Sequence, residues 1–317
     1  MDSFLGVKFL AVCVLDLAMG DPRWLPHPVR LMGVVIQACE RVMCALCKTA
    51  LTKRIAGLLL ALGLPCICFV MVQGMIQYAE HLHETLGAVV WVIVGYTTLA
   101  ARDLWNHAMS VYQAITVEGL PEARLAVSQI VGRDTTDLSE PDLVRATIES
   151  VAENTADGIV APLVYLALGG PPLAMAYKAI NTLDSMVGYR NERYRDLGWA
   201  SARLDDVVNW LPARLTALSI IVAASLRLQR GQASWRMCRR DARKHPSPNS
   251  GWPEAAMAGA LGVQLGGVNV YGGRVEERGT FGDPDCLLTA SHIPVALHIL
   301  GFASFILFVM LLVGVMW

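Results

Sequence analysis

The sequence predicts an all-α fold: a polytopic helical integral membrane protein with large cytoplasmic helical connections. Hydrophobic residues make up 54% of the 317 residues and charged residues only 17%, below the roughly 25% of ordinary soluble domains. Residues 55–79 and 286–317 contain no Asp, Glu, Lys or Arg. Both runs exceed the ~20 residues that a helix needs to cross the hydrocarbon core. Composition and these uncharged runs therefore indicate several membrane helices.

The hydrophobic segments are of two kinds, uninterrupted and broken. The first segment lacks a basic start and carries Asp16 near its end, so we expect it to be retained rather than cleaved as a signal peptide. Two broken segments contain prolines, and such segments fit spans, re-entrant elements or helices on the membrane face. Spans are predicted near 4–20, 55–79, 85–101 and 293–317, and the ambiguous apolar segments are 159–177 and 207–226. Because no internal repeat or linker divides the chain, we expect residues 1–317 to form a single membrane-embedded domain.

The distribution of basic residues predicts the orientation. Six Lys and Arg lie within residues 23–54, whereas residues 80–84 contain none, which places the first stretch in the cytoplasm. Residues 227–244 carry seven basic residues against one Asp and should be cytoplasmic too. This stretch lacks interleaved aromatic residues apart from Trp235, so it indicates contact with anionic lipid headgroups and no nucleic acid. We expect a multi-pass protein of the cell (inner or plasma) membrane with its active site facing the cytoplasm.

The eight cysteines lie largely in apolar surroundings, and the single C-x-x-C has no second pair to complete a zinc site. We therefore expect free thiols that act as small core residues.

An acidic stripe is predicted in the segment RATIESVAENTADG. Glu149, Glu153 and Asp157 follow Arg145 at intervals of four, which places them on one helical face, and Asn154 lies beside them. Three acids against one arginine leave negative charge, which Mg²⁺ would neutralise because it prefers oxygen ligands and often shares them with substrate phosphates. Glu153 and Asp157 are the predicted metal ligands. A solvated helix face with an i,i+4 salt bridge is the alternative interpretation.

The segment HPSPNSGWPEAAMAGALGVQLGG resembles an anion-binding turn ahead of a helix. Ser247, Asn249 and Ser250 precede an Ala/Gly-rich helix, whose first N–H groups and dipole favour negative charge. Phosphate is the expected ligand. The alternative is a Pro-rich turn in which Asn249 or Ser250 is an ordinary N-cap and Pro253 lies in the first turn.

A third polar group follows the first hydrophobic segment, in DLAMGDPRWLPHPVR. Gly20, Asp21 and three prolines predict an extended exit from the first helix. His27 and Arg30 would then lie near the membrane surface, where Arg30 could bind a carboxylate or phosphate with two hydrogen bonds. A structural loop with Arg30 as a lipid anchor is the alternative.

A polar face crosses the apolar segment KAINTLDSMVGYRNERYRDLG. Lys178, Asn181 and Asp184 follow helical spacing, and Arg190 comes shortly after them. Such a face packs poorly against lipid and must meet water, protein or a ligand.

Five ordered blocks of the sequence resemble the adenosylcobinamide-phosphate synthase family of cobalamin (corrinoid) biosynthesis, which are integral membrane enzymes. The blocks are GDPRWLPHPVR, ESVAENTADGIVAPL, KAINTLDSMVGYRNERY, the cluster of Asp205, Asp206, Asn209 and Pro212, and HPSPNSGWPEAAMAGAL, followed by LGG and YGG turns at 265–267 and 271–273. The sequence lacks a P-loop, so ATP would be bound without that motif.

The resemblance implies an ATP-dependent amide ligation. A carboxylate of adenosylcobyric acid would be joined to aminopropanol phosphate, or a related amino alcohol or amino acid phosphate, to give adenosylcobinamide phosphate. ATP and Mg²⁺ are the expected cofactors, and other membrane enzymes of late cobalamin assembly are candidate partners. Our candidates for metal or catalytic work are Glu149, Glu153, Asp157, Asp184 and Lys178, and for phosphate or substrate binding Arg30, His27, Asn154, Asn181, Arg190, Ser247, Asn249 and Ser250. A membrane regulatory or sensor protein and a transporter remain alternative functions.

Overall fold

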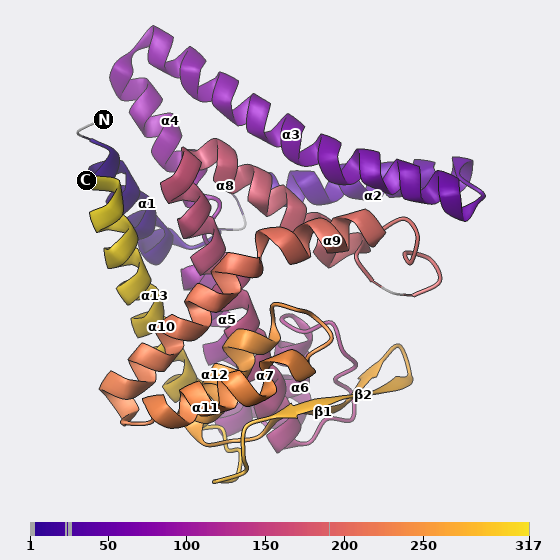
Figure 1. Ribbon diagram of the computed structural model, residues 1–317, viewed down its shortest axis with the longest axis vertical. Helices are drawn as coiled ribbons and strands as arrows, with labels where there is room; N and C mark the ends of the chain where they lie inside the picture. Colours follow the sequence, from indigo (N-terminus) through magenta and orange to yellow (C-terminus); the bar gives the residue numbers. More distant parts are fainter. Residues whose placement is uncertain (1–3, 23, 25–26, 190, 317) are drawn as a thin grey trace. The chain divides into compact units, whose positions relative to one another are not determined.

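The structure, a computed structural model, describes residues 4–22, 24, 27–189 and 191–316, and helices dominate it (Figure 1). It divides into two compact units. The first contains residues 1–100, 161–209 and 311–317, and the second contains residues 101–160 and 210–310. Both are built mainly from helices, which confirms the predicted all-α class.

The first unit is a bundle in which α3 and α8 pack along one another. α8 also contacts α2, α4 and α9, and α1 packs against α4. The helices of this unit are α1 (Leu5–Met19), α2 (Pro28–Leu46), α3 (Ala50–Leu82), α4 (Glu84–Tyr96), α8 (Ala161–Val187), α9 (Trp199–Val208) and the last turns of α13 (His292–Met316).

Local sequence sets the ends of the longest helix. Thr49 and Thr52 cap the start of α3 reciprocally, because each side-chain oxygen accepts the other residue's backbone N–H at 3.2 Å. At its other end, His83 stops α3 and begins α4, since its Nδ1 accepts the N–H of Thr85 at 3.1 Å. The two apolar helices are therefore joined through a single residue, and they pack on one another.

A kink interrupts α8 where the sequence predicts a break. Gly169 and Gly170 leave the helical region, and Gly170 has a φ of 69°, a conformation that glycine adopts without strain. Pro171 and Pro172 follow in the first turn of the next helical stretch. Proline fits there because the backbone N–H groups of a first turn have no acceptor within the helix. These four residues, the GGPP sequence, lie within the broken segment 159–177, so the interruption predicted there is confirmed.

The second unit surrounds a core of small and branched apolar side chains drawn from its helices and the base of a hairpin. α12 is buried along its whole length except at Trp252. The elements of this unit are α5 (Ala101–Gln113), the π-helix η1 (Ala114–Glu118), α6 (Leu120–Ser128), α7 (Glu140–Thr155), the π-helix η2 (Ala156–Val160), α10 (Trp210–Leu228), α11 (Gly231–Asp241), the 3₁₀ helix η3 (Ala242–Lys244), α12 (Gly251–Leu261), β1 (Leu265–Tyr271), β2 (Arg274–Phe281) and most of α13.

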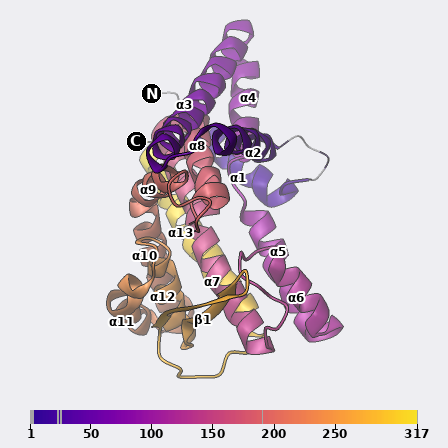
Figure 2. The ribbon, with the colours of Figure 1, turned by 90° about the vertical axis from the view of Figure 1, so that its right-hand side faces the viewer.

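The β-hairpin is the feature that the sequence did not predict. β1 and β2 pair antiparallel, with an irregularity between Gly266 and Val268, and β1 packs against α7 and α12 (Figure 2). The YGG sequence is a turn, since Gly272 and Gly273 both have positive φ. The LGG sequence is not a separate turn but the start of β1, where glycines with positive φ accommodate the bulge.

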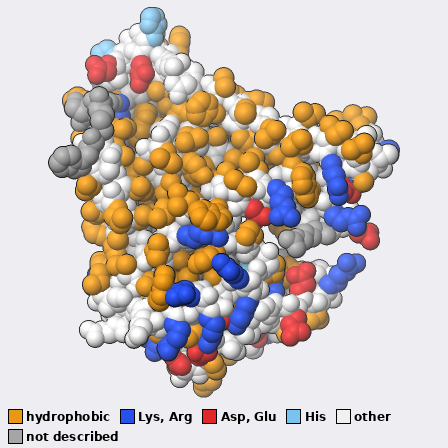
Figure 3. Space-filling model, viewed as in Figure 1, with side chains coloured by type: hydrophobic (Ala, Val, Ile, Leu, Met, Phe, Trp, Pro, Cys, Tyr) orange, Lys and Arg blue, Asp and Glu red, His pale blue; other side chains and the backbone are white. Residues whose placement is uncertain are grey.

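Among the residues that the structure describes, five helical stretches are long and apolar enough to cross a membrane, namely Ala50–Leu82, Glu84–Glu118, Glu140–Val187, Trp210–Leu228 and His292–Met316. They overlap the predicted spans near 55–79, 85–101 and 293–317 and both ambiguous segments. The segment near 4–20 forms α1, which has 15 residues and is shorter than a typical span. Figure 3 shows hydrophobic side chains along the surface of α3, which fits contact with lipid.

All eight cysteines are free thiols, as predicted. The prediction that they are core residues is wrong for most of them: Cys238 is buried, whereas Cys66 and Cys286 are exposed and the other five are half-buried. Cys66 lies on α3, where an apolar side chain can face lipid instead of a protein core.

Candidate active site

A mainly polar cavity of about 110 Å³ lies within the second unit. Its walls come from the loop after α6, one face of α7, the segment before α12, the first turn of α12, and both strands of the hairpin. The charged or titratable side chains in its lining are Arg133, Glu149, Glu153, His245, Glu254 and Arg278. Carboxylates and guanidinium groups therefore share one small, partly open space.

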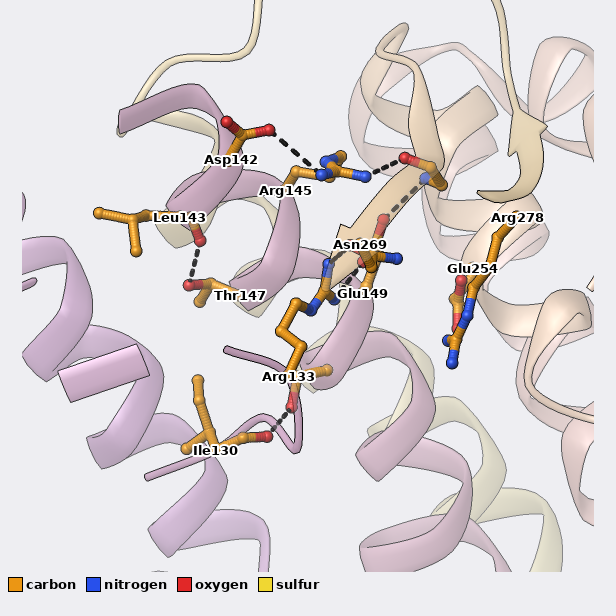
Figure 4. Close-up of polar contacts among 12 residues, drawn as sticks. Ile130, Arg133, Asp142, Leu143, Arg145, Thr147, Glu149, Glu254, Asn269 and Arg278 are labelled. Atoms are coloured by element: carbon orange, nitrogen blue, oxygen red, sulfur yellow. Dashed lines mark hydrogen bonds and ion pairs between the residues drawn. The ribbon is translucent and has the colours of Figure 1, made fainter. Parts of the chain in front are cut away.

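Glu149 joins the walls of this cavity. It forms a buried ion pair with Arg133, and its Oε1 accepts the backbone N–H of Gly266 at 2.7 Å. Arg133 also donates to the side-chain oxygen of Asn269 on β1 (Figure 4). Both carboxylate oxygens of Glu149 thus hold other groups in place, which gives the residue a structural part in forming the cavity.

Arg145 binds the hairpin rather than the acidic stripe. Its guanidinium donates to the backbone oxygens of Gly266 and Val268, the latter at 3.0 Å, and it pairs with Asp142 at 3.1 Å (Figure 4). The i,i+4 salt bridge from Arg145 to Glu149, considered from the sequence alone, is not the arrangement found. The intervals of four do place Glu149 and Glu153 together in the cavity lining.

Residues 245–250, here called the Pro-Ser-Asn segment, form many of their hydrogen bonds with one another. Ser247 Oγ accepts the backbone N–H groups of Asn249 and Ser250 at 3.2 and 3.3 Å. Asn249 Oδ1 accepts from Arg214 at 3.2 Å, and Ser250 Oγ donates to Glu153 Oε1 at 2.7 Å. The segment therefore orients a carboxylate of the cavity, and its backbone donors at 249 and 250 already have an acceptor.

His245 and Glu254 form a second titratable pair in the cavity. The backbone N–H of Ser247 donates to His245 Nδ1 at 2.9 Å, which leaves the proton of a neutral ring on Nε2. Nε2 lies 3.7 Å from Glu254 Oε1. Burial, with the nearby carboxylates of Glu149 and Glu153, raises the pKa of Glu254 well above its usual range, and burial lowers the pKa of His245. Near neutral pH these shifts favour the uncharged form of both groups.

Of the two remaining predicted residues of the second unit, Asn154 lines the cavity and Asp157 does not. Asn154 is exposed at the cavity lining, where its amide donates to the backbone oxygen of Ser150 at 2.8 Å. Asp157 is half-buried in η2, one turn beyond Glu153, and is not among the lining residues. Within the described residues, no group of three or more His, Cys, Asp or Glu is arranged to hold a metal ion. A magnesium ion at Glu153 and Asp157 would therefore take further oxygen ligands from phosphate or water.

Five predicted residues belong to the first unit. His27 is buried and caps α2, since its Nδ1 accepts the N–H of Val29 at 3.4 Å, while Nε2 lies 3.1 Å from Asp21 Oδ1. Arg30 is exposed one turn later. Lys178, Asn181 and Asp184 lie half-buried on α8. Arg190 lies outside the described residues.

Asp205 is the centre of a buried polar cluster in the first unit. Its two carboxylate oxygens accept from the amides of Asn209, at 3.0 Å, and Asn181, at 3.5 Å. Tyr177 donates to Asn209 Oδ1 at 2.9 Å. Burial and the neighbouring Asp184 carboxylate raise the pKa of Asp205 from 3.8 to about 7. A group with this pKa can exchange a proton near neutral pH.

The raised pKa predicts that stability decreases as pH rises from about 4 to 7. Below this window Asp205 is protonated in the folded and unfolded chains, and within it the folded state binds more protons, so the free energy of unfolding falls. The melting temperature of the purified protein should therefore decrease less for Asp205→Asn than for the wild type between pH 5 and 8. Asp206→Asn, one residue away, is the control. A wild-type minus D205N difference that does not change with pH would contradict the prediction.

Sequence reasoning missed several residues of the cavity. Arg133, Asn269 and Arg278 stand in no local pattern with the acidic stripe, and their role depends on the hairpin folding against α7. Glu254 stands within the block HPSPNSGWPEAAMAGAL, but its burial could not be predicted from the sequence. Asp205 did carry a signal, because it falls in one of the five ordered sequence blocks.

The comparisons with known proteins agree with those blocks. Residues 9–300 match the family described as CobD/Cbib protein. The cobalamin biosynthesis protein CobD of Geobacter metallireducens is 51% identical over 279 residues, covering 88% of this chain and 87% of the relative. CobD of Halalkalibacterium halodurans is 43% identical over 312 residues (97% and 96%), and the cobalamin biosynthesis protein CbiB of Salmonella typhi is 43% identical over 301 residues (94% of each). No solved structure matches. The family resemblance inferred from the sequence is thereby confirmed, and the chain belongs to the CobD/Cbib protein family.

Proposed function

We propose that this protein is an enzyme of cobalamin biosynthesis, an ATP-dependent ligase that forms an amide bond. It joins adenosylcobyric acid to aminopropanol phosphate, or a related amino alcohol or amino acid phosphate, and gives adenosylcobinamide phosphate. The names of its curated relatives support the pathway. The observation that supports the reaction is the cavity in which guanidinium groups and carboxylates meet.

The chemistry requires activation of a weak electrophile. A carboxylate oxygen of the corrinoid attacks the terminal phosphorus of ATP, which gives an acyl phosphate and ADP. The amine then attacks the acyl carbon, the C–N bond forms, phosphate leaves with the C–O electron pair, and a base takes the surplus proton from nitrogen. Glu254, which burial holds in its protonated form before substrate binds, could take that proton once a substrate ammonium group beside it favours the carboxylate form.

The residues near Glu153 suit a magnesium ion by donor type, because carboxylate oxygens are the protein ligands that this ion prefers. Glu153 and Asp157 would hold it, and Ser250 fixes the orientation of Glu153 through a 2.7 Å hydrogen bond. When bound, the ion would neutralise charge on the phosphate oxygens of the nucleotide.

Turnover by purified protein tests the proposal directly. Wild-type protein in detergent or nanodiscs, given ATP, Mg²⁺, adenosylcobyric acid and aminopropanol phosphate, should form adenosylcobinamide phosphate and ADP in equal amounts, measured by mass spectrometry and a coupled ADP assay. Omission of ATP is the control. Absence of product with a folded protein would favour a sensor or transporter, which is distinguished by corrinoid uptake into proteoliposomes.

We also predict that residues 102–158 and 227–285 lie on the cytoplasmic side, where ATP is available and where the basic stretch is retained. Single cysteines at Ser139 and Gln232, both exposed, should react with an impermeant thiol reagent only after the membrane is opened. The background must lack the eight native cysteines. Labelling of intact cells at either position would overturn this topology.

A further inference from the structure

The cavity of the second unit has both basic and acidic side chains left over once its internal ion pair is counted. Arg133 and Glu149 neutralise one another in a buried ion pair. The lining then holds one further guanidinium group, Arg278, and two further carboxyl groups, Glu153 and Glu254. A site with separated positive and negative poles is complementary to a zwitterion rather than to a simple anion.

Arg278, which lines this space, has unused hydrogen-bonding capacity. Its Nε is buried and has no hydrogen-bond partner among the described residues, and an unsatisfied buried donor is costly. Nη2 makes a 3.6 Å ion pair with Glu276 on the solvent side. The guanidinium also lies 4.8 Å from the centre of the Tyr271 ring, which holds its plane in place. Such a planar, fixed cation is suited to a phosphate group.

Glu254 lies beside Arg278 in the cavity (Figure 4). It is fully buried at the first turn of α12 and faces His245. An ammonium group placed against Glu254 would add positive charge to that of Arg278 and would favour the carboxylate form of Glu254. The arrangement therefore offers one partner for a phosphate and another for an amine.

The size of the cavity limits its ligand. At about 110 Å³ it is well below the roughly 300–1,000 Å³ of pockets that enclose drug-sized ligands. It has room for a short molecule, whereas a corrinoid or a whole nucleotide could insert only one end.

We infer that this cavity is the subsite for the aminoalkyl phosphate substrate, with the phosphate on the guanidinium of Arg278 and the ammonium on the carboxyl of Glu254. The inference rests on the proposed ligase function and assigns one of its three substrates to named residues. The terminal phosphates of ATP carry the same chemistry as the phosphate of the amine substrate, so the experiment must separate these two sources.

The test measures binding without turnover. Isothermal titration of the full-length protein in nanodiscs, without ATP or corrinoid, uses 1-amino-2-propanol phosphate as the ligand. Arg278→Gln should weaken the affinity for this ligand at least 10-fold. Arg278→Lys keeps the charge but loses the planar fork, so its affinity should lie between those of the wild type and Arg278→Gln. Arg274→Gln is the matched control, because Arg274 is exposed on the same strand and does not line the cavity. Affinity for ATP should be unchanged in all three variants.

A second measurement covers the amine end of the ligand. Glu254→Gln should weaken binding of 1-amino-2-propanol phosphate but not of inorganic phosphate, whereas Arg278→Gln should weaken both. Melting temperatures confirm that each variant is folded, and Arg278→Lys replaces Arg278→Gln if the latter is not.

Two outcomes would overturn the subsite. One is unchanged affinity for the amine phosphate in Arg278→Gln, and the other is loss of ATP affinity with amine binding intact, which would make this a nucleotide subsite. Failure of the ligase function itself appears separately, as absence of product from wild-type protein that still binds the amine phosphate.

Discussion

Replacement of Glu153 by Gln should lower amide ligation by roughly 100-fold or more, equivalent to at least ~2.7 kcal/mol of transition-state stabilisation. The substitution preserves the size of the side chain and leaves an oxygen that can still accept from Ser250 Oγ. It removes the charge that would hold a magnesium ion with the nucleotide. Asp157→Asn, one turn later in η2, should have the same effect. The measurement is kcat with saturating ATP at several Mg²⁺ concentrations, and an increase in Mg²⁺ should recover part of the lost activity.

The controls separate metal binding from a surface charge effect. Corrinoid binding without nucleotide should change little in either variant, and Glu277→Gln on the exposed face of the hairpin should keep full activity. If the stripe were only a solvated face, loss of an exposed ion pair would cost ~0.2 to 1 kcal/mol and leave turnover nearly normal. Near-normal turnover in both Glu153→Gln and Asp157→Asn would therefore refute the metal assignment.

The features that could be predicted from the sequence are those that depend on residues close together along the chain. Helical spacing brought Glu149 and Glu153 onto one face because neighbours at four-residue intervals always share a face. The GGPP break in α8 followed from the backbone requirements of Gly and Pro. Long uncharged runs identified α3 and α13, since only burial in protein or lipid accommodates them.

The partners of these residues could not be predicted, because they come from distant parts of the chain. Arg145 binds backbone oxygens on β1 that lie more than a hundred positions away, and no periodicity in α7 reveals a carbonyl on another element. The Pro-Ser-Asn segment looked like an open anion site because its donors are visible in the sequence. Their acceptor, Ser247 Oγ, depends on the turn that the segment adopts.

The second large effect should be on stability, and it concerns Glu149. Glu149→Leu should lower the free energy of unfolding by about 3–5 kcal/mol, because it leaves the guanidinium of Arg133 buried without its counterion. The two side chains are only 7% and 8% exposed, so water cannot replace the lost partner. The backbone N–H of Gly266 also loses its acceptor, which adds to the cost. Tryptophan fluorescence during thermal and denaturant unfolding in detergent measures the change.

A double variant distinguishes the buried pair from a general packing defect. Arg133→Met combined with Glu149→Leu removes both charges and should recover much of the stability, since an apolar pair in the place of a buried ion pair is often tolerated. Recovery should be incomplete because the Gly266 N–H stays unpaired. Asp285→Ala, which removes the more exposed Arg230–Asp285 pair of the same unit, should cost no more than about 1 kcal/mol. If Glu149→Leu keeps the wild-type stability and loses only turnover, Glu149 acts in catalysis, and its contacts with Arg133 and Gly266 are not what hold the cavity together.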